Sequence, residues 1–369
     1  MASNTKHPDY YLLFIVALLV VFGILILSSV SANYSFEKYG NTYYILRRQS
    51  IFLLIGLFLA YLAYRINLNI IKKLSPLLLL FGLIILSLVF VPGIGSRSEE
   101  SLSAARWIGW GQYSFQPSEF LKLFFILYLA SLLGSRIESN KKASLGKTLI
   151  PFFVVLFIIG IALFYQPNLS TLGIIALTGL IIYSCANIPL WQPIIAGFIL
   201  LAFFISIMIL APYRMDRLKV FFNPDQEPQG IGYQSGQALI AVGSGGIMGV
   251  GLGMGNWKLG FLPQTISDSI FAVYAEESGF IGALILVLLF LSFSWAGFRI
   301  AKRSENGFFR LTSIGITSWI IIQAFVNIGA MIGILPLTGI PLPFIGYGGS
   351  ALITELIAMG VLLNISKNL

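Results

Sequence analysis

Asp268 is the residue whose type and position most clearly permit chemistry. It stands immediately before a long apolar stretch, in the local sequence LPQTISDSIF over 262–271. A carboxylate at such a place is a good helix N-cap, because it accepts hydrogen bonds from the first amides of the helix. A carboxylate at a membrane–water boundary, beside an open outer cavity, can also act as a general base. On these grounds alone, the capping interpretation is favoured.

Five more charged residues lie within apolar stretches, where a charge is costly and indicates a functional site by default. Glu119 and Lys122 are three residues apart, so they can pair on one face of a helix. A structural ion pair and a direct role fit this spacing equally well. Glu277, next to Glu276, could instead pair with Lys122, and Glu355 lies in the last apolar stretch. We predict that the first four of these residues are mainly structural.

Basic residues between the apolar stretches are candidates for binding a phosphate. Arginine binds phosphate through two parallel hydrogen bonds, whereas lysine acts as a point charge. Each of these residues could equally be a surface anchor at the level of the lipid head groups. The candidates are Arg106, Arg214, Arg217, Lys219 and Lys258.

Several kinds of chemistry are made improbable by what the sequence lacks. Its single cysteine, Cys185, permits no intrachain disulfide, and its single histidine, His7, precedes the first apolar stretch. The chain therefore cannot form a Cys/His zinc site by itself. It also lacks the glycine-rich fingerprints of nucleotide-binding loops, so nucleotide hydrolysis is not expected. No dedicated metal site is visible, and a requirement for Mg²⁺ or Mn²⁺ stays open.

The composition indicates a membrane protein. Of the 369 residues, 57% are hydrophobic and only 10% are charged, whereas soluble domains carry about 25% charged residues. We interpret residues 1–369 as one integral membrane domain. The net charge is +9. In a membrane protein, such a charge is better explained by the orientation of the spans and by contact with anionic lipid head groups than by nucleic-acid binding.

Long apolar runs predict an all-α polytopic membrane protein of about ten transmembrane helices. The first run is long enough to remain as a span instead of a cleaved signal peptide. The fifth and sixth spans meet in a very tight turn at Gln166-Pro167-Asn168. The predicted spans are 11–29, 50–66, 74–91, 115–134, 148–166, 168–187, 191–211, 269–298, 309–335 and 350–366.

The charges of the connecting loops predict that both termini are cytoplasmic. The short connections 67–73, 135–147 and 299–308 are basic, as inner loops usually are. Arg47 and Arg48 would then lie outside, which weakly opposes this orientation. The longest connection, 212–268 between spans seven and eight, would be extracytoplasmic. Its glycine-rich part, ALIAVGSGGIMGVGLGMG over 238–255, is expected to pack against the outer membrane face or partly re-enter it.

A series of segments, taken together, resembles the shape–elongation–division–sporulation (SEDS) family. The matches follow the order of the family's motifs and cover most of the chain. They are ARWI at 105–108, FQPSEF at 115–120 with Lys122, QPNLST at 166–171, NP at 223–224, GYQ at 232–234, QALIAVGSGG at 237–246, LPQTISDSIFAVYAEESG at 262–279, Asn327, and PLTGIPLPFIGYGG at 336–349. The RRQ sequence at 47–49 resembles the FtsW branch of the family slightly more than the others.

The resemblance implies a ten-helix enzyme of the bacterial cytoplasmic membrane, a peptidoglycan glycosyltransferase acting in cell division or elongation. Family members polymerise lipid II into glycan strands together with a class B penicillin-binding protein, a transpeptidase, and other division or elongation membrane proteins. Asp268 then becomes the leading candidate for the catalytic base, in place of a cap. The substrate-binding candidates implied are Arg106, Trp107, Arg214, Arg217, Lys258, Gln237 and Ser244.

The sequence departs from the family pattern at a few positions near these candidates. Asn168 stands where an Asp is usual, and Gln264, Ile266 and Ser269 replace Glu, His and Phe around Asp268. Gly346 replaces a Ser. Two other functions are therefore kept as alternatives: a lipid II flippase, whose path the intramembrane charges would line, and a non-catalytic scaffold that regulates a penicillin-binding protein.

Overall fold

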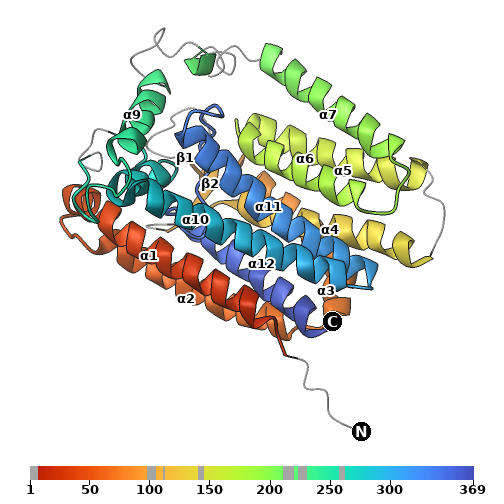
Figure 1. The fold of residues 1–369 in the computed structure, drawn as a ribbon. Coiled ribbons are helices and arrows are strands. Elements are labelled where there is room, and N and C mark those ends of the chain that lie inside the picture. Colours follow the sequence, from red (N-terminus) through yellow and green to blue (C-terminus); the bar gives the residue numbers. More distant parts are fainter. Residues whose placement is uncertain are drawn as a thin grey trace.

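The computed structural model describes residues 7–97, 105–110, 113–139, 145–210, 220–222, 231–256 and 262–369. Its long helices are α1 (Tyr10–Tyr39), α2 (Tyr44–Arg65), α3 (Leu68–Leu88), α4 (Pro117–Ser139), α5 (Leu145–Tyr165), α6 (Leu169–Ser184), α7 (Trp191–Leu210), α10 (Ile270–Arg303), α11 (Gly307–Met331) and α12 (Gly349–Lys367). They lie side by side in a bundle, with the start of α1 and the end of α12 at one end (Figure 1).

The prediction of a polytopic helical membrane protein is confirmed. Within the described residues, nine helices are long and apolar enough to cross a membrane. The sixth predicted span corresponds to α6, which is shorter, at 16 residues. The tight turn predicted at 166–168 is present, because α5 ends at Tyr165 and α6 begins at Leu169.

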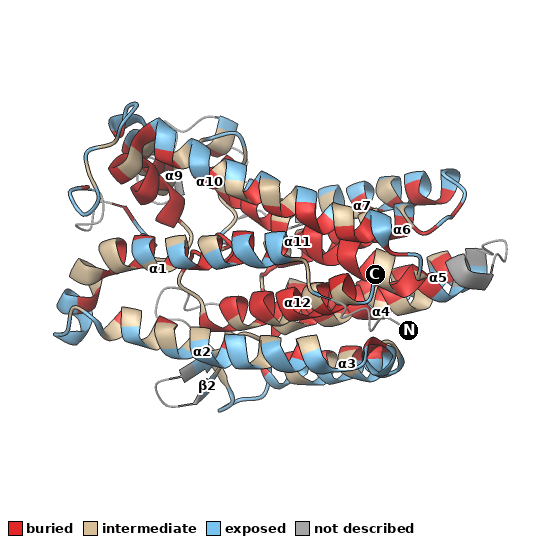
Figure 2. Cartoon of the chain, turned by 60° about the horizontal axis from the view of Figure 1, so that its bottom comes forward, coloured by how far each residue is buried: buried red, intermediate tan, exposed pale blue. Residues whose placement is uncertain are grey.

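The centre of the bundle is formed by α11 and α12, and α2 lies at its periphery. In the most apolar window of each helix, 78% of the residues of α12 and 72% of those of α11 are buried, against 17% in α2. Figure 2 shows the same contrast between the interior helices and the outer faces of α1, α2 and α3. Most exposed side chains of the outer helices are apolar, as a lipid-facing surface requires.

Glycines allow the closest helix contacts in this bundle. A Cβ atom on Gly134, near the end of α4, would lie 2.6 Å from the amide nitrogen of Phe308. A Cβ atom on Gly307, the first residue of α11, would lie 2.5 Å from the carbonyl oxygen of Gly134. The backbones of α4 and α11 therefore touch directly, as small residues permit in membrane helix packing.

A small antiparallel sheet joins α3 to α4, although an all-α fold was predicted. Its strands are β1 (Gly95–Arg97), β2 (Ala105–Trp110) and β3 (Tyr113–Phe115), in that spatial order. Ile108 pairs with Gly95 on one side and with Phe115 on the other. β1 and β3 have only three residues each, too few to show an alternating pattern, so periodicity could not reveal these two strands.

The connection between α7 and α10 contains another helix, α9 (Ile231–Ser244). This helix lies at the end of the bundle opposite the start of α1 (Figure 1). The connection corresponds to the predicted loop 212–268, and its residues 211–219, 223–230 and 257–261 lie outside the described part of the chain.

Candidate functional site

Asp268 lies in a turn segment, 262–269, that leads into α10. The helix begins at Ile270, and Ser269 occupies its N-cap position without making a side-chain capping bond. Asp268 is thus one residue too early to be the N-cap. Its side chain is half-buried, and the start of α10, which it precedes, lies at the same end of the bundle as α9 (Figure 1).

Asn327 of α11 fixes the backbone of this turn segment. Its side-chain amide donates one hydrogen bond to the carbonyl oxygen of Asp268 and one to that of Ile340, each 2.8 Å long. Asn327 itself is buried. The carboxylate of Asp268 faces Gly339, where a Cβ atom would lie 3.4 Å from its Oδ2 atom. Gly339 has a φ of +68°, and this conformation favours glycine.

Three residues that depart from the family pattern, Gln264, Ile266 and Gly346, have defined contacts in this turn or in the loop 332–348 beside it. Gln264 adopts a φ of +56°, and its carbonyl oxygen accepts the amides of Ser267 and Ser269, both at 3.1 Å. Ile266 packs against the hydrophobic core, and its carbonyl oxygen accepts the amide of Tyr347 at 2.8 Å. A Cβ atom on Gly346 would lie only 2.8 Å from the Cβ of Pro341, so this chain has no room for a serine there without rearrangement.

A row of polar side chains on α11 faces the loop 332–348, which connects α11 to α12. Trp319, Gln323 and Asn327 are four residues apart, so they lie on one face of the helix. The side-chain amide of Gln323 donates to the carbonyl oxygen of Pro341 at 3.0 Å. Its oxygen accepts from the indole nitrogen of Trp319 at 2.9 Å and from the ammonium of Lys122 at 2.8 Å.

Lys122 and Glu119 form the ion pair that their spacing predicted. The ammonium lies 2.9 Å from Oε2 of Glu119, and both side chains are almost fully buried. It also lies over the ring of Trp319, 5.0 Å from the centroid. Glu277 is not a partner of Lys122, because its carboxylate accepts instead from the hydroxyl of Ser29 on α1, at 2.7 and 3.0 Å. The ion pair therefore joins α4 to α11.

Glu355 of α12 anchors the other end of the same loop. Its Oε2 atom accepts the amide of Phe344 at 2.8 Å, and its side chain is 1% exposed. Phe344 has a φ of +63°, a costly conformation for a residue with a side chain. The buried carboxylate therefore stabilises a strained turn close to the Asp268 segment.

Glu276 and Glu277 lie where α10 is interrupted. Gly279 within this helix has a φ of +64° and a ψ of −167°, which is not helical. The carbonyls of Glu276 and Glu277 accept the amides of Val250 and Gly251, at 3.1 and 3.0 Å. On the other side of the break, Phe280 donates to Gly246 and Ile281 to Ile247. The glycine-rich segment 245–256 thus supplies the hydrogen bonds that the interrupted helix lacks.

Glycines permit this approach of the segment to α10. A Cβ atom on Gly249 would lie 2.2 Å from the carbonyl oxygen of Glu277, and one on Gly279 would lie 2.3 Å from the amide nitrogen of Gly249. The side chain of Glu276 adds a bond of 2.7 Å from the amide of Asn256 to its Oε1 atom. The structural role predicted for these two glutamates stays a prediction.

The substrate-binding candidates are spread over several elements. Arg106 of β2 donates to the carbonyls of Gln166 and Pro167, at 3.0 and 2.8 Å, so it also stabilises the turn between α5 and α6. Trp107 follows it in the strand and is half-buried. Two candidates lie on α9: the buried side-chain oxygen of Gln237 has no hydrogen-bond partner among the described residues, and the hydroxyl of Ser244 donates to the carbonyl oxygen of Ala241 at 2.7 Å.

The other three candidates, Arg214, Arg217 and Lys258, lie outside the described residues. Contacts bring several of the remaining elements together near Asp268. The hydroxyl of Ser170, at the start of α6, donates to Thr338 at 2.7 Å, one residue before Gly339. The side-chain amide of Gln234 on α9 lies 3.2 Å from the hydroxyl of Ser269.

Sequence reasoning did not assign a role to Gln323 or to Asn327. The available signal was the occurrence of two amide side chains four residues apart within an apolar span, where polar groups are costly and normally bonded. That signal identifies a polar face on a helix, and it does not tell which backbone segment that face holds.

The comparisons with known proteins agree over the whole chain. A family model described as a cell cycle protein of the FtsW, RodA and SpoVE type matches residues 10–369. Stage V sporulation protein E of Bacillus subtilis is 35% identical over 367 residues, covering 100% of this chain and 99% of the relative. A protein of Trichlorobacter lovleyi named probable peptidoglycan glycosyltransferase FtsW is 36% identical over 361 residues, covering 98% of this chain and 93% of the relative.

Solved structures show the same fold. One chain, from a structure described as the structural coordination of polymerization and crosslinking by a peptidoglycan synthase complex, superposes with a TM-score of 0.79 at 25% identity, covering 98% of both chains. The rod shape determining protein RodA of Thermus thermophilus gives a TM-score of 0.72 at 25% identity, covering 98% of this chain and 97% of that one.

Proposed function

Because this chain belongs to the FtsW, RodA and SpoVE family of cell cycle proteins, we propose that it is a peptidoglycan glycosyltransferase. It polymerises lipid II into glycan strands at the outer face of the bacterial cytoplasmic membrane, in cell division or elongation. Support comes from relatives named for this activity that match nearly the full chain. The structural observation that supports it most is Asp268, a half-buried carboxylate just before the N-cap of α10.

In this proposal, Asp268 is the catalytic base. Its carboxylate takes the proton from the acceptor sugar hydroxyl as that oxygen attacks the anomeric carbon of the donor. The bond from this carbon to the lipid pyrophosphate breaks, and the configuration at the carbon is inverted. A positioned base contributes about 10²–10⁴-fold to such a step. Asn327 holds the backbone of Asp268 and of Ile340, which fixes where the carboxylate can reach.

Binding of the pyrophosphate is assigned to basic residues of the outer segments. Arg106, Arg214, Arg217 and Lys258 are the candidates, with Trp107, Gln237 and Ser244 contacting the rest of the substrate. The two hydrogen bonds from Arg106 to Gln166 and Pro167 hold its side chain in a fixed position. Its positive charge would therefore already be in place when the pyrophosphate binds. The unpartnered oxygen of Gln237 is suited to accept a hydrogen bond from a sugar hydroxyl or amide.

A divalent cation, Mg²⁺ or Mn²⁺, is proposed only as a partner of the pyrophosphate. Across the described part of the chain, no three His, Cys, Asp or Glu side chains gather as a metal site would require. The leaving group's own oxygens would therefore supply most of the ligands, and the cation would neutralise their charge. Removal of metals with EDTA, followed by addition of Mg²⁺ or Mn²⁺, tests whether polymerisation depends on the cation.

The partner proposed is a class B penicillin-binding protein that crosslinks the new strands, with other division or elongation membrane proteins. The similar fold in a peptidoglycan synthase complex supports this. We also propose that both termini are cytoplasmic and that 212–268 is outside. In a Cys185→Ser background, an impermeant thiol reagent added outside should label Ser235→Cys and not Lys73→Cys. The reverse result would overturn this orientation.

The activity itself is tested with purified full-length protein, its transpeptidase partner and labelled lipid II in vesicles. Formation of glycan strands is expected. Transfer of lipid II between leaflets without strands would instead establish a flippase. If neither occurs while the complex with the transpeptidase forms normally, the protein is a scaffold, and the proposal is wrong.

A further inference from the structure

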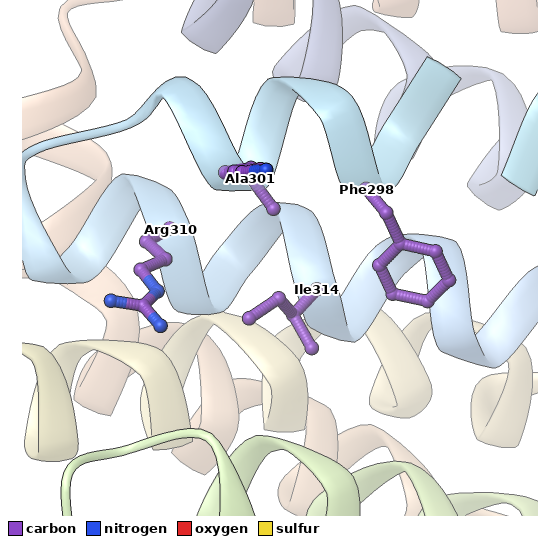
Figure 3. A pocket seen from close by; sticks show the side chains of 5 residues that line it. Phe298, Ala301, Arg310 and Ile314 are labelled. Carbon is purple, nitrogen blue, oxygen red and sulfur yellow. The ribbon is translucent and has the colours of Figure 1, made fainter. Parts of the chain in front are cut away.

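A basic pocket lies where α10 ends and α11 begins. Its volume is about 350 Å³, within the range of ~300–1,000 Å³ typical of small-ligand sites. Phe298, Ala301 and Lys302 line it from α10, and Arg310 and Ile314 from α11. Figure 3 shows the guanidinium of Arg310 on one side and the ring of Phe298 on the other, with Ile314 between them.

The two basic residues of this pocket have no partner among the described residues. In the described part of the chain, neither Lys302 nor Arg310 makes a hydrogen bond or an ion pair. Arg299, one turn earlier on α10, is different, because it pairs with Asp9 and lies 4.5 Å from the ring centroid of Trp295. The bundle thus neutralises one cation at this end and leaves the pocket's charge uncompensated.

The position of Arg310 adds to this positive potential. It lies in the first turn of α11, whose N-cap is Asn306, and the start of a helix carries a partial positive charge. A cation there is not stabilised by the helix, whereas an anion would be. Among the described side chains of these two helix ends and their connection, the other charges are Arg303, which is exposed at the end of α10, and Glu305 in the connecting turn. Three basic residues against one acidic residue leave this set of side chains positive.

The pocket is also at the depth of the lipid head groups. Residues 304–306 connect the two spanning helices, so the helix ends mark the boundary between membrane and water. Below the charges, Phe298 is 41% exposed and continues the apolar outer surface of α10. A ligand that fits must therefore be anionic at one end and apolar at the other.

From these observations we infer that the pocket binds the head group of an anionic glycerophospholipid. The phosphodiester contacts Lys302 and Arg310, and the first carbons of an acyl chain pack on Phe298 and Ile314. Basic pockets between transmembrane helices bind anionic lipids in this way. The site lies where α10 ends, at the end of the bundle away from the start of α10 (Figure 1), and the inference does not depend on the proposed glycosyl transfer.

The test compares lipid binding by the full-length protein and two double variants of equal charge. Lys302→Gln/Arg310→Gln removes the pocket's cations, and Arg65→Gln/Lys73→Gln removes two exposed cations that do not line it. Binding of phosphatidylglycerol and of phosphatidylethanolamine with the same acyl chains is counted by native mass spectrometry. Since none of these side chains is fully buried, both variants should fold, and circular dichroism with thermal unfolding checks this.

The unmodified protein and the control variant should prefer phosphatidylglycerol. Each basic residue contributes about fivefold, the equivalent of ~1 kcal/mol, so the pocket variant should lose about tenfold or more of this preference. Inorganic phosphate should not compete, because it lacks acyl chains. Equal loss in both variants, no loss in the pocket variant, or competition by free phosphate would each overturn the inference.

Discussion

Two irregular segments at the same end of the bundle are held in different ways. The loop 332–348, together with the Asp268 turn, is held by buried side chains: Asn327, Gln323 and Glu355 each bond to its backbone. The glycine-rich segment 245–256 is held mainly by its own backbone, which pairs with the break in α10 around Gly279.

This difference follows from what each segment has to do in a lipid-surrounded protein, where every backbone polar group needs a partner. Backbone pairing with an interrupted helix satisfies both sides at once, and it requires only that glycines let the chains approach. Side-chain bonds are more costly, because they bury amides and carboxylates. They can, however, place individual residues, and the segment they hold contacts the proposed catalytic carboxylate.

The largest effect is expected from Asp268→Asn, which leaves both segments in place. The variant keeps the shape of the side chain, and the backbone carbonyl still accepts from Asn327. It removes the proton acceptor, so polymerisation of lipid II should fall about a hundredfold or more. Thermal unfolding and binding to the transpeptidase should be unchanged. Near-normal polymerisation by this well-folded variant would remove Asp268 from the catalytic role.

Lys122→Met should destabilise the loop 332–348 indirectly, because Lys122 bonds to Gln323, which bonds to the backbone of that loop. It leaves Glu119 buried without its partner and takes a donor from Gln323, at a cost of ~3–5 kcal/mol. The double variant Glu119→Gln/Lys122→Met should be less destabilised than the single one, as thermal unfolding would show. If Lys122→Met kept full stability and lost polymerisation, Lys122 would have a catalytic role instead.

Gly279→Ala should destabilise the pairing of segment 245–256 with α10. A side chain there is strained at a φ of +64° and would collide with the amide of Gly249, and strained backbone alone costs ~1–3 kcal/mol. Gly243→Ala on α9 is the matched control, because no atom lies within 4 Å of its added Cβ. Unfolding at the same temperature for both variants would contradict the contact between segment 245–256 and α10.

The smallest difference is expected between Asn327→Ala and Asn364→Ala, because each asparagine donates hydrogen bonds to two backbone carbonyls. Asn364 donates to Ala63 and Ile66, at 2.9 and 2.6 Å, at the end of the bundle away from Asp268. Each variant should lose ~1–3 kcal/mol of stability. Below the unfolding temperature, only Asn327→Ala should polymerise lipid II more slowly, by a lower kcat. An equal loss of kcat in both would make Asn327 merely structural.

Much of this architecture could be predicted from the sequence, because long apolar runs allow few alternatives in a membrane. The turn between α5 and α6 and the pair of Glu119 and Lys122 depended on local spacing, and both predictions are confirmed. The pairing suggested for Glu277 with Lys122 is wrong, because it depended on which helices are neighbours. Ser29, the actual partner of Glu277, is 248 residues away in the chain.

The site was harder to predict for the same reason. Asp268 could be selected, but the cap interpretation could be rejected only once the first residue of α10 was known. The partners of Asn327 and Gln323 are backbone carbonyls, which every residue has, so no sequence pattern reveals them. The prediction that Asp268 is the base, and those for the substrate-binding residues, stay predictions.

The direct contact of Gly134 with Gly307 has a consequence for motion. It joins α4 and α11 by their backbones at one end, while Glu119, Lys122 and Gln323 join them close to the other. Two helices clamped at both ends move as one rigid body. Any opening that admits a bulky lipid substrate must then come from elements packed around this pair, such as α3, which packs on α4 and has 28% of its most apolar window buried.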